Sequence, residues 1–325
     1  MSPSGRVPLA ARRILAGDRA TLARVISDVE NRAPSAIPVL RALYAHTGRA
    51  RVIGFTGPLG VGKSSLISAL LGRLRAAGRR VGIVAVDPSS PFSGGAVLGD
   101  RIRIERRAGD DGVFFRSMGS RGHAGGVAAA TREVVRLLDA FGMDVVLLET
   151  VGSGQVDVEV RTVATTNVVV LVPHLGDEVQ TLKAGLFEIA DVFCVNKGDL
   201  PGADLARKDL VELTALTPAR GAWRPRVVTA SAKEATGIDE LWEAIEAHEA
   251  FLDADGRRTA GERERIAGEL IELVRERVEG ELTVALRSDR NLQALVDRVA
   301  SRALDPHAAA DRLYRGRRPR RPPAR

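Results

Sequence analysis

Residues 57–64 read Gly57-Pro58-Leu59-Gly60-Val61-Gly62-Lys63-Ser64. They match the pattern G-x-x-x-x-G-K-[ST], in which glycines let backbone N–H groups wrap around nucleotide phosphates. An apolar, strand-like run precedes the match and a helical pattern follows it, which is the setting that this loop requires. We therefore expect a phosphate-binding loop that continues to Ser65. Lys63 should reach the β- and γ-phosphates, and the Ser64 hydroxyl should ligate Mg²⁺.

Strand-like and helix-like segments alternate on both sides of this loop. The expected strands are Val52–Thr56, Val81–Val86, Val113–Arg116, Val145–Glu149, Val168–Val172, Val192–Asn196 and Val227–Thr229. Several are apolar without alternation, which is typical of strands covered on both faces. Helical stretches such as Lys63–Ala77 and Gly126–Phe141 separate most of them. The pattern predicts an α/β P-loop NTPase fold with a mostly parallel, three-layer sheet.

Helical extensions are expected at both ends of this domain. We divide the chain into a helical N-terminal extension (1–50), the P-loop domain (51–255), a helical C-terminal arm (256–313) and a disordered Arg/Pro tail (314–325). In the arm, Ile266, Leu270, Leu273, Val274 and Val278 form an apolar stripe at helical spacing. This stripe could pack on the parent domain or pair with a second subunit, and the sequence favours neither.

Composition narrows the class of protein. Six arginines in the last eleven residues supply most of the net charge of +7, so we expect a solvated tail rather than a nucleic-acid-binding arm. The longest apolar runs fall far short of the roughly 20 residues that span a bilayer. The single cysteine, Cys194, cannot form an intrachain disulfide, and no stretch resembles a secretory signal. We expect a cytoplasmic protein that binds neither membrane nor nucleic acid.

A second motif indicates which base the nucleotide carries. Asn196-Lys197-Gly198-Asp199 follows an apolar run, so it lies where open α/β sheets bind ligands. A carboxylate at Asp199 can accept hydrogen bonds from N1–H and the 2-amino group of guanine, whereas adenine would leave it unpaired. Lys197 should pack over the base, and Asn196 should tie the motif to the phosphate loop. Further along, Ser231-Ala232-Lys233 resembles the fifth GTPase motif, whose backbone contacts the guanine carbonyl. We therefore expect GTP and GDP as ligands.

Acidic residues and glycines follow other strands. Glu149 and Gly152 form an acidic-x-x-Gly motif, which places a carboxylate near the metal and an N–H near the γ-phosphate. Asp87 and Asp100 are further candidate Mg²⁺ ligands, since Mg²⁺ prefers oxygen donors and retains waters. The glycine-rich segments 94–99, 121–126 and 152–155 are candidate switches that the γ-phosphate orders.

Beyond these motifs, the chain resembles the MeaB/ArgK GTPases associated with methylmalonyl-CoA mutase. The resemblance is carried by GPLGVGKSS, VAVDPSSPFSGGAVLGDRIR, RSMGSRGHAGGVAAATRE, VVLLETVGSGQ, GDEVQTLKAGLFEIADVFCVNKGD and IDELWEAIEAH. It covers about 51–250, with weaker similarity in both helical flanks. It implies a homodimer with low intrinsic GTP hydrolysis. It also implies a cobalamin-dependent acyl-CoA mutase as partner, whose adenosylcobalamin loading and protection are gated by nucleotide state.

The resemblance also implies roles for individual residues. Lys63, Asp87, Asp100 and Glu149 would be the phosphate, metal and catalytic residues, and Gln155 would lie in the second switch. The segment 176–183, with Asp177, Gln180 and Lys183, would be an additional switch that responds to the partner. The chain departs from the family at Ser153, where valine is usual, at His174, where glycine is usual, and at Gly198, where alanine is usual.

Other functions share parts of this pattern. A nickel metallochaperone GTPase would need Cys/His clusters, which one cysteine and five scattered histidines do not provide, so no metal-cargo site is expected. A GTPase chaperone of another metalloenzyme stays an alternative. The Asn-Lys-Gly-Asp motif opposes a kinase or transport ATPase, and no D-x-H-x-x-G motif marks the chain as the mutase itself. A nucleotide-dependent RNA-binding module rests only on the arginine tail.

Overall fold

The computed structural model describes residues 7–87, 110–119, 126–150, 162–173, 186–216 and 223–317 of the chain. The chain divides into two compact units, Met1–Ala260 and Gly261–Arg325. The first unit contains the sheet and both nucleotide motifs.

Seven parallel strands form one sheet in the first unit. Their order is β3-β2-β4-β1-β5-β6-β7. The strands are β1 (Arg51–Thr56), β2 (Val81–Asp87), β3 (Val113–Gly119), β4 (Val145–Thr150), β5 (Thr166–Leu171), β6 (Val192–Val195) and β7 (Arg226–Thr229). Each strand expected from the sequence is present, with bounds shifted by at most a few residues. The predicted parallel α/β fold is confirmed.

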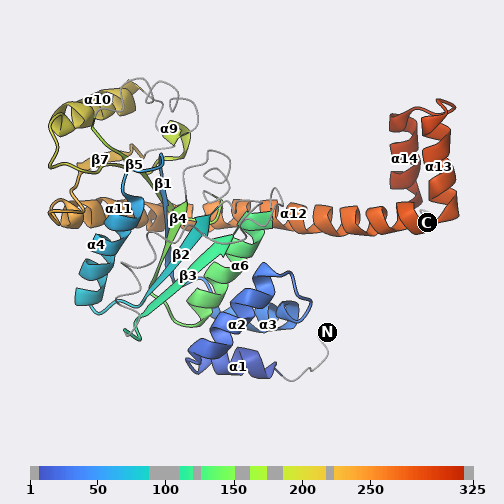
Figure 1. Cartoon of the computed structure of the whole chain (residues 1–325), viewed down its shortest axis with the longest axis horizontal. Helices are drawn as coiled ribbons and strands as arrows, with labels where there is room; N and C mark the ends of the chain where they lie inside the picture. The colour runs from blue at the N-terminus through green and yellow to red at the C-terminus, as the bar shows by residue number, and fades with distance from the viewer. Residues whose placement is uncertain are drawn as a thin grey trace. The chain divides into compact units, whose positions relative to one another are not determined.

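Helices cover both faces of this sheet (Figure 1). On one face, α6 and the N-terminal helices pack over Val52, Val84 and Val146. On the other, α4 and α11 pack over Ile53, Ile83 and Val168. The helices of this unit are α1 (Leu9–Leu15), α2 (Arg19–Glu30), α3 (Ala36–Leu43), α4 (Lys63–Ala76), α6 (Gly126–Ala140), α9 (Leu186–Ile189), α10 (Ala203–Leu216) and α11 (Ile238–Asp253), with 3₁₀ turns at Tyr44–His46 and Ala254–Gly256. This arrangement is the predicted three-layer architecture.

The N-terminal extension is an integral part of the first unit. Asp18 caps α2 by accepting a 3.0 Å hydrogen bond from the Thr21 N–H. The far end of α2 is tied to the edge strand β3, since Arg116 pairs with Glu30 at 2.6 Å. Ile14, Leu22 and Ile26 are fully buried in the core that α6 shares. The extension therefore covers one face of the sheet.

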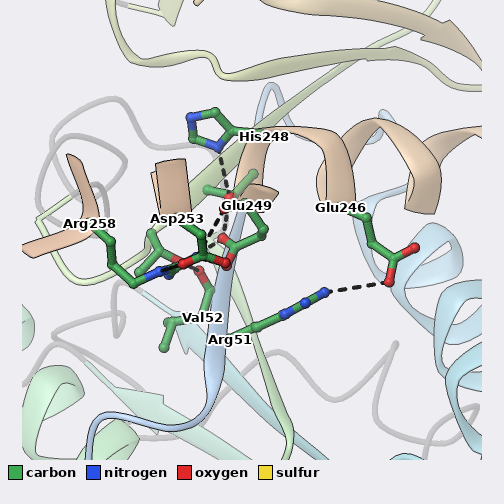
Figure 2. Close-up of polar contacts among 9 residues, drawn as sticks. Arg51, Val52, Glu246, His248, Glu249, Asp253 and Arg258 are labelled. Atoms are coloured by element: carbon green, nitrogen blue, oxygen red, sulfur yellow. Dashed lines mark hydrogen bonds and ion pairs between the residues drawn. The ribbon is translucent and has the colours of Figure 1, made fainter. Parts of the chain in front are cut away.

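A buried polar network lies at the amino ends of the central strands (Figure 2). Glu249, near the end of α11, is fully buried and accepts hydrogen bonds from Thr165 Oγ1 at 2.9 Å and Thr166 Oγ1 at 2.5 Å. Arg258 pairs with the same carboxylate at 2.8 Å and also pairs with Asp253. Because Arg258 lies in the first turn of α12 (Arg257–Ser288), the start of that helix is joined to the first unit.

The second unit is helical. It contains most of α12, followed by α13 (Arg290–Ala300) and α14 (Pro306–Arg317). The apolar stripe along α12 is exposed at Leu270, Leu273, Val274 and Val278. Helix α14 continues into the stretch 314–325 that the sequence assigns to a disordered tail, and 318–325 lie outside the described residues. None of the helices described here is both long enough and apolar enough to cross a membrane.

Candidate nucleotide-binding site

The loop between β1 and α4 has a backbone that only glycine adopts readily. Gly57, Gly60 and Gly62 have φ values of 140°, 80° and 89°. A Cβ on Gly57 would lie 2.1 Å from the Val170 carbonyl oxygen of β5, and one on Gly62 would lie 2.6 Å from Asn196 Nδ2. The loop is thus wedged against a neighbouring strand and the second motif. It ends at the amino terminus of α4, whose N–H groups and dipole favour an anion.

Lys63 is held inside this loop. Its side chain is buried, and Nζ donates to the carbonyl oxygens of Gly57 at 2.6 Å and Pro58 at 2.9 Å. The ammonium therefore lies beside the glycine-rich turn. Phosphate oxygens bound in the turn would be charged acceptors, which form stronger hydrogen bonds with an ammonium than neutral carbonyls do.

Ser64 and Glu149 meet at the same edge of the sheet. Ser64, in the first turn of α4, donates its hydroxyl hydrogen bond to Glu149 Oε1 near the end of β4. A hydroxyl and a carboxylate side by side are oxygen donors of the kind that Mg²⁺ requires. The residues that the structure describes therefore fit a magnesium ion next to the phosphates.

A pocket of about 320 Å³ adjoins the loop. It combines the end of the phosphate loop with the two motifs assigned to guanine. Its lining residues are Gly62, Ser65, Asn196, Lys197, Asp199, Leu200, Ser231, Ala232 and Lys233. All but Leu200 are sequence-predicted positions or neighbours within the motifs. Leu200 is a partly exposed apolar residue that the sequence analysis missed, because it follows the motif without a pattern of its own.

Asn196 joins the three motifs. Its Nδ2 donates to the Val61 carbonyl at 2.8 Å, and its Oδ1 accepts from the Ala232 N–H at 3.2 Å. Its backbone N–H donates to the Leu171 carbonyl of β5 at 2.8 Å. The side chain is buried. It thus holds the phosphate loop and the 231–233 segment at fixed positions on either side of the pocket. The Ala232 N–H that could contact a guanine carbonyl is therefore already engaged with Asn196.

Asp199 is the carboxylate that faces the pocket. Ser231 Oγ donates to its Oδ1 at 2.5 Å, and this bond is the main reason that the pKa of Asp199 lies below its usual value. Lys233 and Lys197 lower that pKa further through their charges. Ser231 is itself buried, and its Oγ accepts from the Glu234 N–H at 3.2 Å. The carboxylate is therefore ionised and oriented, as an acceptor for two guanine N–H groups must be.

The two motif lysines differ in their surroundings. Lys197 has a left-handed backbone with φ of 57°, and its Nζ donates to the Gly60 carbonyl at 3.0 Å, so its stem crosses from one motif to the other. Lys233 is exposed and pairs with Glu234 at 3.0 Å, which is the main cause of its raised pKa. Lys197 therefore forms a wall of the pocket, and Lys233 lies at its mouth.

Several predicted residues lie outside the described ranges. Asp87 ends β2 beside β4, but only its backbone is described. Asp100, Gly152 and Gln155 lie outside the described residues, as do Asp177, Gln180, Lys183 and the departures Ser153 and His174. The structure thus brings together Lys63, Ser64 and Glu149 on the phosphate side, and Asn196, Lys197, Asp199 and Ser231 on the base side.

Comparison with known proteins connects this site to a family. The family of methylmalonyl-CoA mutase-associated GTPases named MeaB matches residues 22–286. A protein of Pyrococcus abyssi whose name describes a GTPase is 44% identical over 306 residues, covering 93% of this chain and 94% of its own length. The GTPase ArgK of Escherichia coli is 39% identical and covers 76% of this chain and 77% of its own length. A mouse protein, the mitochondrial methylmalonic aciduria type A homolog, is 32% identical, covering 81% of this chain and 64% of its own.

A solved structure matches nearly the whole chain. The crystal structure of a LAO/AO transport system kinase superposes with a TM-score of 0.73 and 29% sequence identity. The match covers 97% of this chain and 99% of the other. The similarity therefore extends beyond the sheet to the helical extensions.

Proposed function

Because this chain belongs to the MeaB family of GTPases, we propose that its nucleotide state controls a cobalamin-dependent acyl-CoA mutase. Its activity is GTP hydrolysis, as the family and its named relatives show. The observation that carries the proposal is a single pocket lined by the phosphate loop and by both base motifs. In it, Ser231 orients Asp199 for guanine beside the phosphate loop. In the proposed role, GTP and GDP forms gate adenosylcobalamin loading and protect the loaded mutase.

Different residues of the site contact the phosphates, the metal ion and the base of GTP. Lys63 donates to the β- and γ-phosphate oxygens, and the backbone N–H groups from Leu59 to Ser65 surround the phosphates. Ser64 and Glu149 would hold Mg²⁺, with Asp87 and Asp100 as further proposed ligands. When bound, Mg²⁺ offsets charge on the phosphate oxygens during hydrolysis. Asp199 accepts from the guanine N1–H and 2-amino groups.

The remaining roles are proposed from the resemblance. Gly152 would donate its N–H to the γ-phosphate, and Gln155 would lie in the second switch. Asp177, Gln180 and Lys183 would belong to the segment that responds to the mutase. We also propose a homodimer. The exposed apolar stripe at Leu270, Leu273, Val274 and Val278 supports it, because burial of that face in a second copy would remove it from water.

Capture of the partner in defined nucleotide states tests the role. The immobilised chain is loaded with a non-hydrolysable GTP analogue or with GDP, exposed to extracts of cells that express an acyl-CoA mutase, and the captured enzyme is identified. We expect a mutase, in amounts that depend on the nucleotide. Capture of a different metalloenzyme would favour the alternative of a chaperone for that enzyme.

A matched variant makes this test specific to the guanine pocket. Asp199→Asn exchanges an acceptor for a donor, so it should bind xanthine nucleotides, which carry a 2-carbonyl in place of the 2-amino group, in preference to GTP. Its capture of the mutase should then follow the xanthosine analogue instead of the guanosine analogue. Equal capture with both analogues would show that the pocket does not govern the interaction.

A further inference from the structure

Gly198 is the residue between the two pocket side chains Lys197 and Asp199. Its N–H donates to the Ala230 carbonyl at 2.9 Å, which lays the motif directly over the segment that follows β7. A Cβ on Gly198 would lie 2.6 Å from Thr229 Cγ2 and 3.2 Å from the Ala230 carbonyl oxygen. The space that a side chain at position 198 would need is therefore occupied by the Thr229 methyl group.

Thr229 occupies this space by its shape and not by its hydroxyl. Its Oγ1 is buried and has no hydrogen-bond partner among the described residues. A buried hydroxyl without a partner carries a desolvation cost, so the hydroxyl gives no reason for threonine here. The methyl group does give a reason for threonine, since Cγ2 fills the space next to Gly198.

The backbone of Thr229 has little freedom to retreat from this contact. Thr229 pairs with Val195 in the parallel register of β6 and β7. Gly237 also packs against this residue, so closely that a Cβ on it would lie 2.1 Å from the Thr229 carbonyl oxygen. An added atom at position 198 would therefore displace the Lys197–Asp199 loop more readily than the strand beneath it.

We propose that Gly198 and Thr229 form a size-matched pair that sets the position of Asp199 against guanine. Because residue 198 has no side chain, the Lys197–Asp199 loop packs directly on the end of β7. The Thr229 methyl group limits how closely it packs, so that Ser231 can donate its hydrogen bond to Asp199. Thr229 is thus a positioning residue for guanine recognition, since it contacts Gly198 but is not among the residues that line the pocket. The proposal rests on the assignment of the pocket to guanine.

The preference for GTP over ITP measures the position of Asp199 directly, because ITP lacks the 2-amino group that the carboxylate contacts. Dissociation constants for both nucleotides are measured by competition with a fluorescent guanine nucleotide. A clear preference in the unmodified chain confirms the pocket itself, so that failure of the pocket and failure of the pair are distinguished. Thermal melting of each variant checks that it folds.

Four variants separate shape from hydrogen bonding. Gly198→Ala should weaken GTP binding by about five- to hundredfold, the range that one excess methyl produces in a packed site, and should reduce the GTP/ITP preference. The double variant Gly198→Ala/Thr229→Ala should restore both, since it frees the space for the new Cβ. Thr229→Val should leave both unchanged because it keeps the methyl group. Thr229→Ala alone should reduce the preference.

The pair is refuted if the double variant binds GTP as weakly as Gly198→Ala. It is also refuted if Thr229→Val loses as much preference as Thr229→Ala, because the hydroxyl would then be the functional group. The two Thr229 variants carry the test on their own if Gly198→Ala does not fold.

Discussion

Removal of the Arg258 guanidinium should destabilise the first unit, because it leaves a fully buried carboxylate at Glu249 without its charged partner. Breaking a buried ion pair from one side costs about 3–5 kcal/mol. The Arg258 side chain is 31% exposed, so water screens part of the interaction and the lower end of that range, about 3 kcal/mol, applies to Arg258→Ala. At roughly 2–4 °C per kcal/mol for a unit of this size, the melting temperature should fall by about 6–12 °C.

The same region offers a matched control. Arg51 pairs with Glu246 at 3.4 Å, and both side chains are substantially exposed (Figure 2). Arg51→Ala should therefore change the free energy of unfolding by less than about 1 kcal/mol. A second comparison uses Glu249→Gln, which keeps an oxygen acceptor for Thr165 and Thr166 but carries no charge.

Thermal melting followed by circular dichroism, with and without GDP, compares the unmodified chain with the three single variants and with the double variant Arg258→Ala/Glu249→Gln. The double variant Arg258→Ala/Glu249→Gln should be more stable than Arg258→Ala alone, because no unpaired charge stays buried. If Arg258→Ala melts like Arg51→Ala, or if the second substitution lowers the melting temperature further, the carboxylate is not held by Arg258 and the reasoning is wrong.

Three further outcomes are expected. Lys63→Ala should lose most GTP hydrolysis, with a barrier higher by about 3 kcal/mol, in a phosphate-release assay; retained turnover would mean that another cation reaches the phosphates. Burial lowers the pKa of His248, so the unfolded chain takes up a proton before the folded one as the pH falls through about 6.5. Stability should thus decline below that pH, and the decline should shrink in His248→Gln; equal declines in urea titrations would contradict this origin. Because the Asp199 pKa is lowered, the carboxylate stays ionised from pH 8 to 5 and the GTP/ITP affinity ratio should be constant there; a steady drop on acidification would show that Asp199 takes up a proton.

The sequence predicts the sheet well because its strands are marked locally. The segments Val145–Leu148 of β4 and Val168–Leu171 of β5 are buried, and each reads as an apolar run without reference to the rest of the chain. The phosphate loop is equally local, since its glycines and Lys63 stand within eight residues. On the base side, the motifs containing Asp199 and Ser231 are separate in the sequence, but each follows its own strand, and parallel strands bring their carboxyl ends to one edge.

Contacts between polar residues that are far apart in the sequence leave no local sequence pattern, so they could not be predicted. Glu249, Thr165 and Arg258 have no shared pattern, and the sequence places a domain border at residue 255, before Arg258. The helix is interrupted there, since Asp255 has a left-handed backbone with φ of 53°. Packing of Arg258 on Glu249 nevertheless joins the next turn to the sheet. The match of Gly198 with Thr229 is likewise invisible until β6 and β7 are paired.

Asn196 has a consequence for how the protein distinguishes its two nucleotides. Its side-chain amide bonds to both sides of the base pocket, at Val61 and Ala232, and its backbone N–H bonds to Leu171 of β5. That end of the ligand should therefore meet the same surface whether two or three phosphates follow it. The contacts to guanosine are then the same for GTP, the substrate of hydrolysis, and for GDP, its product. If the proposed role is correct, the signal that the γ-phosphate has been lost must therefore come from the phosphate end of the nucleotide, away from Asn196.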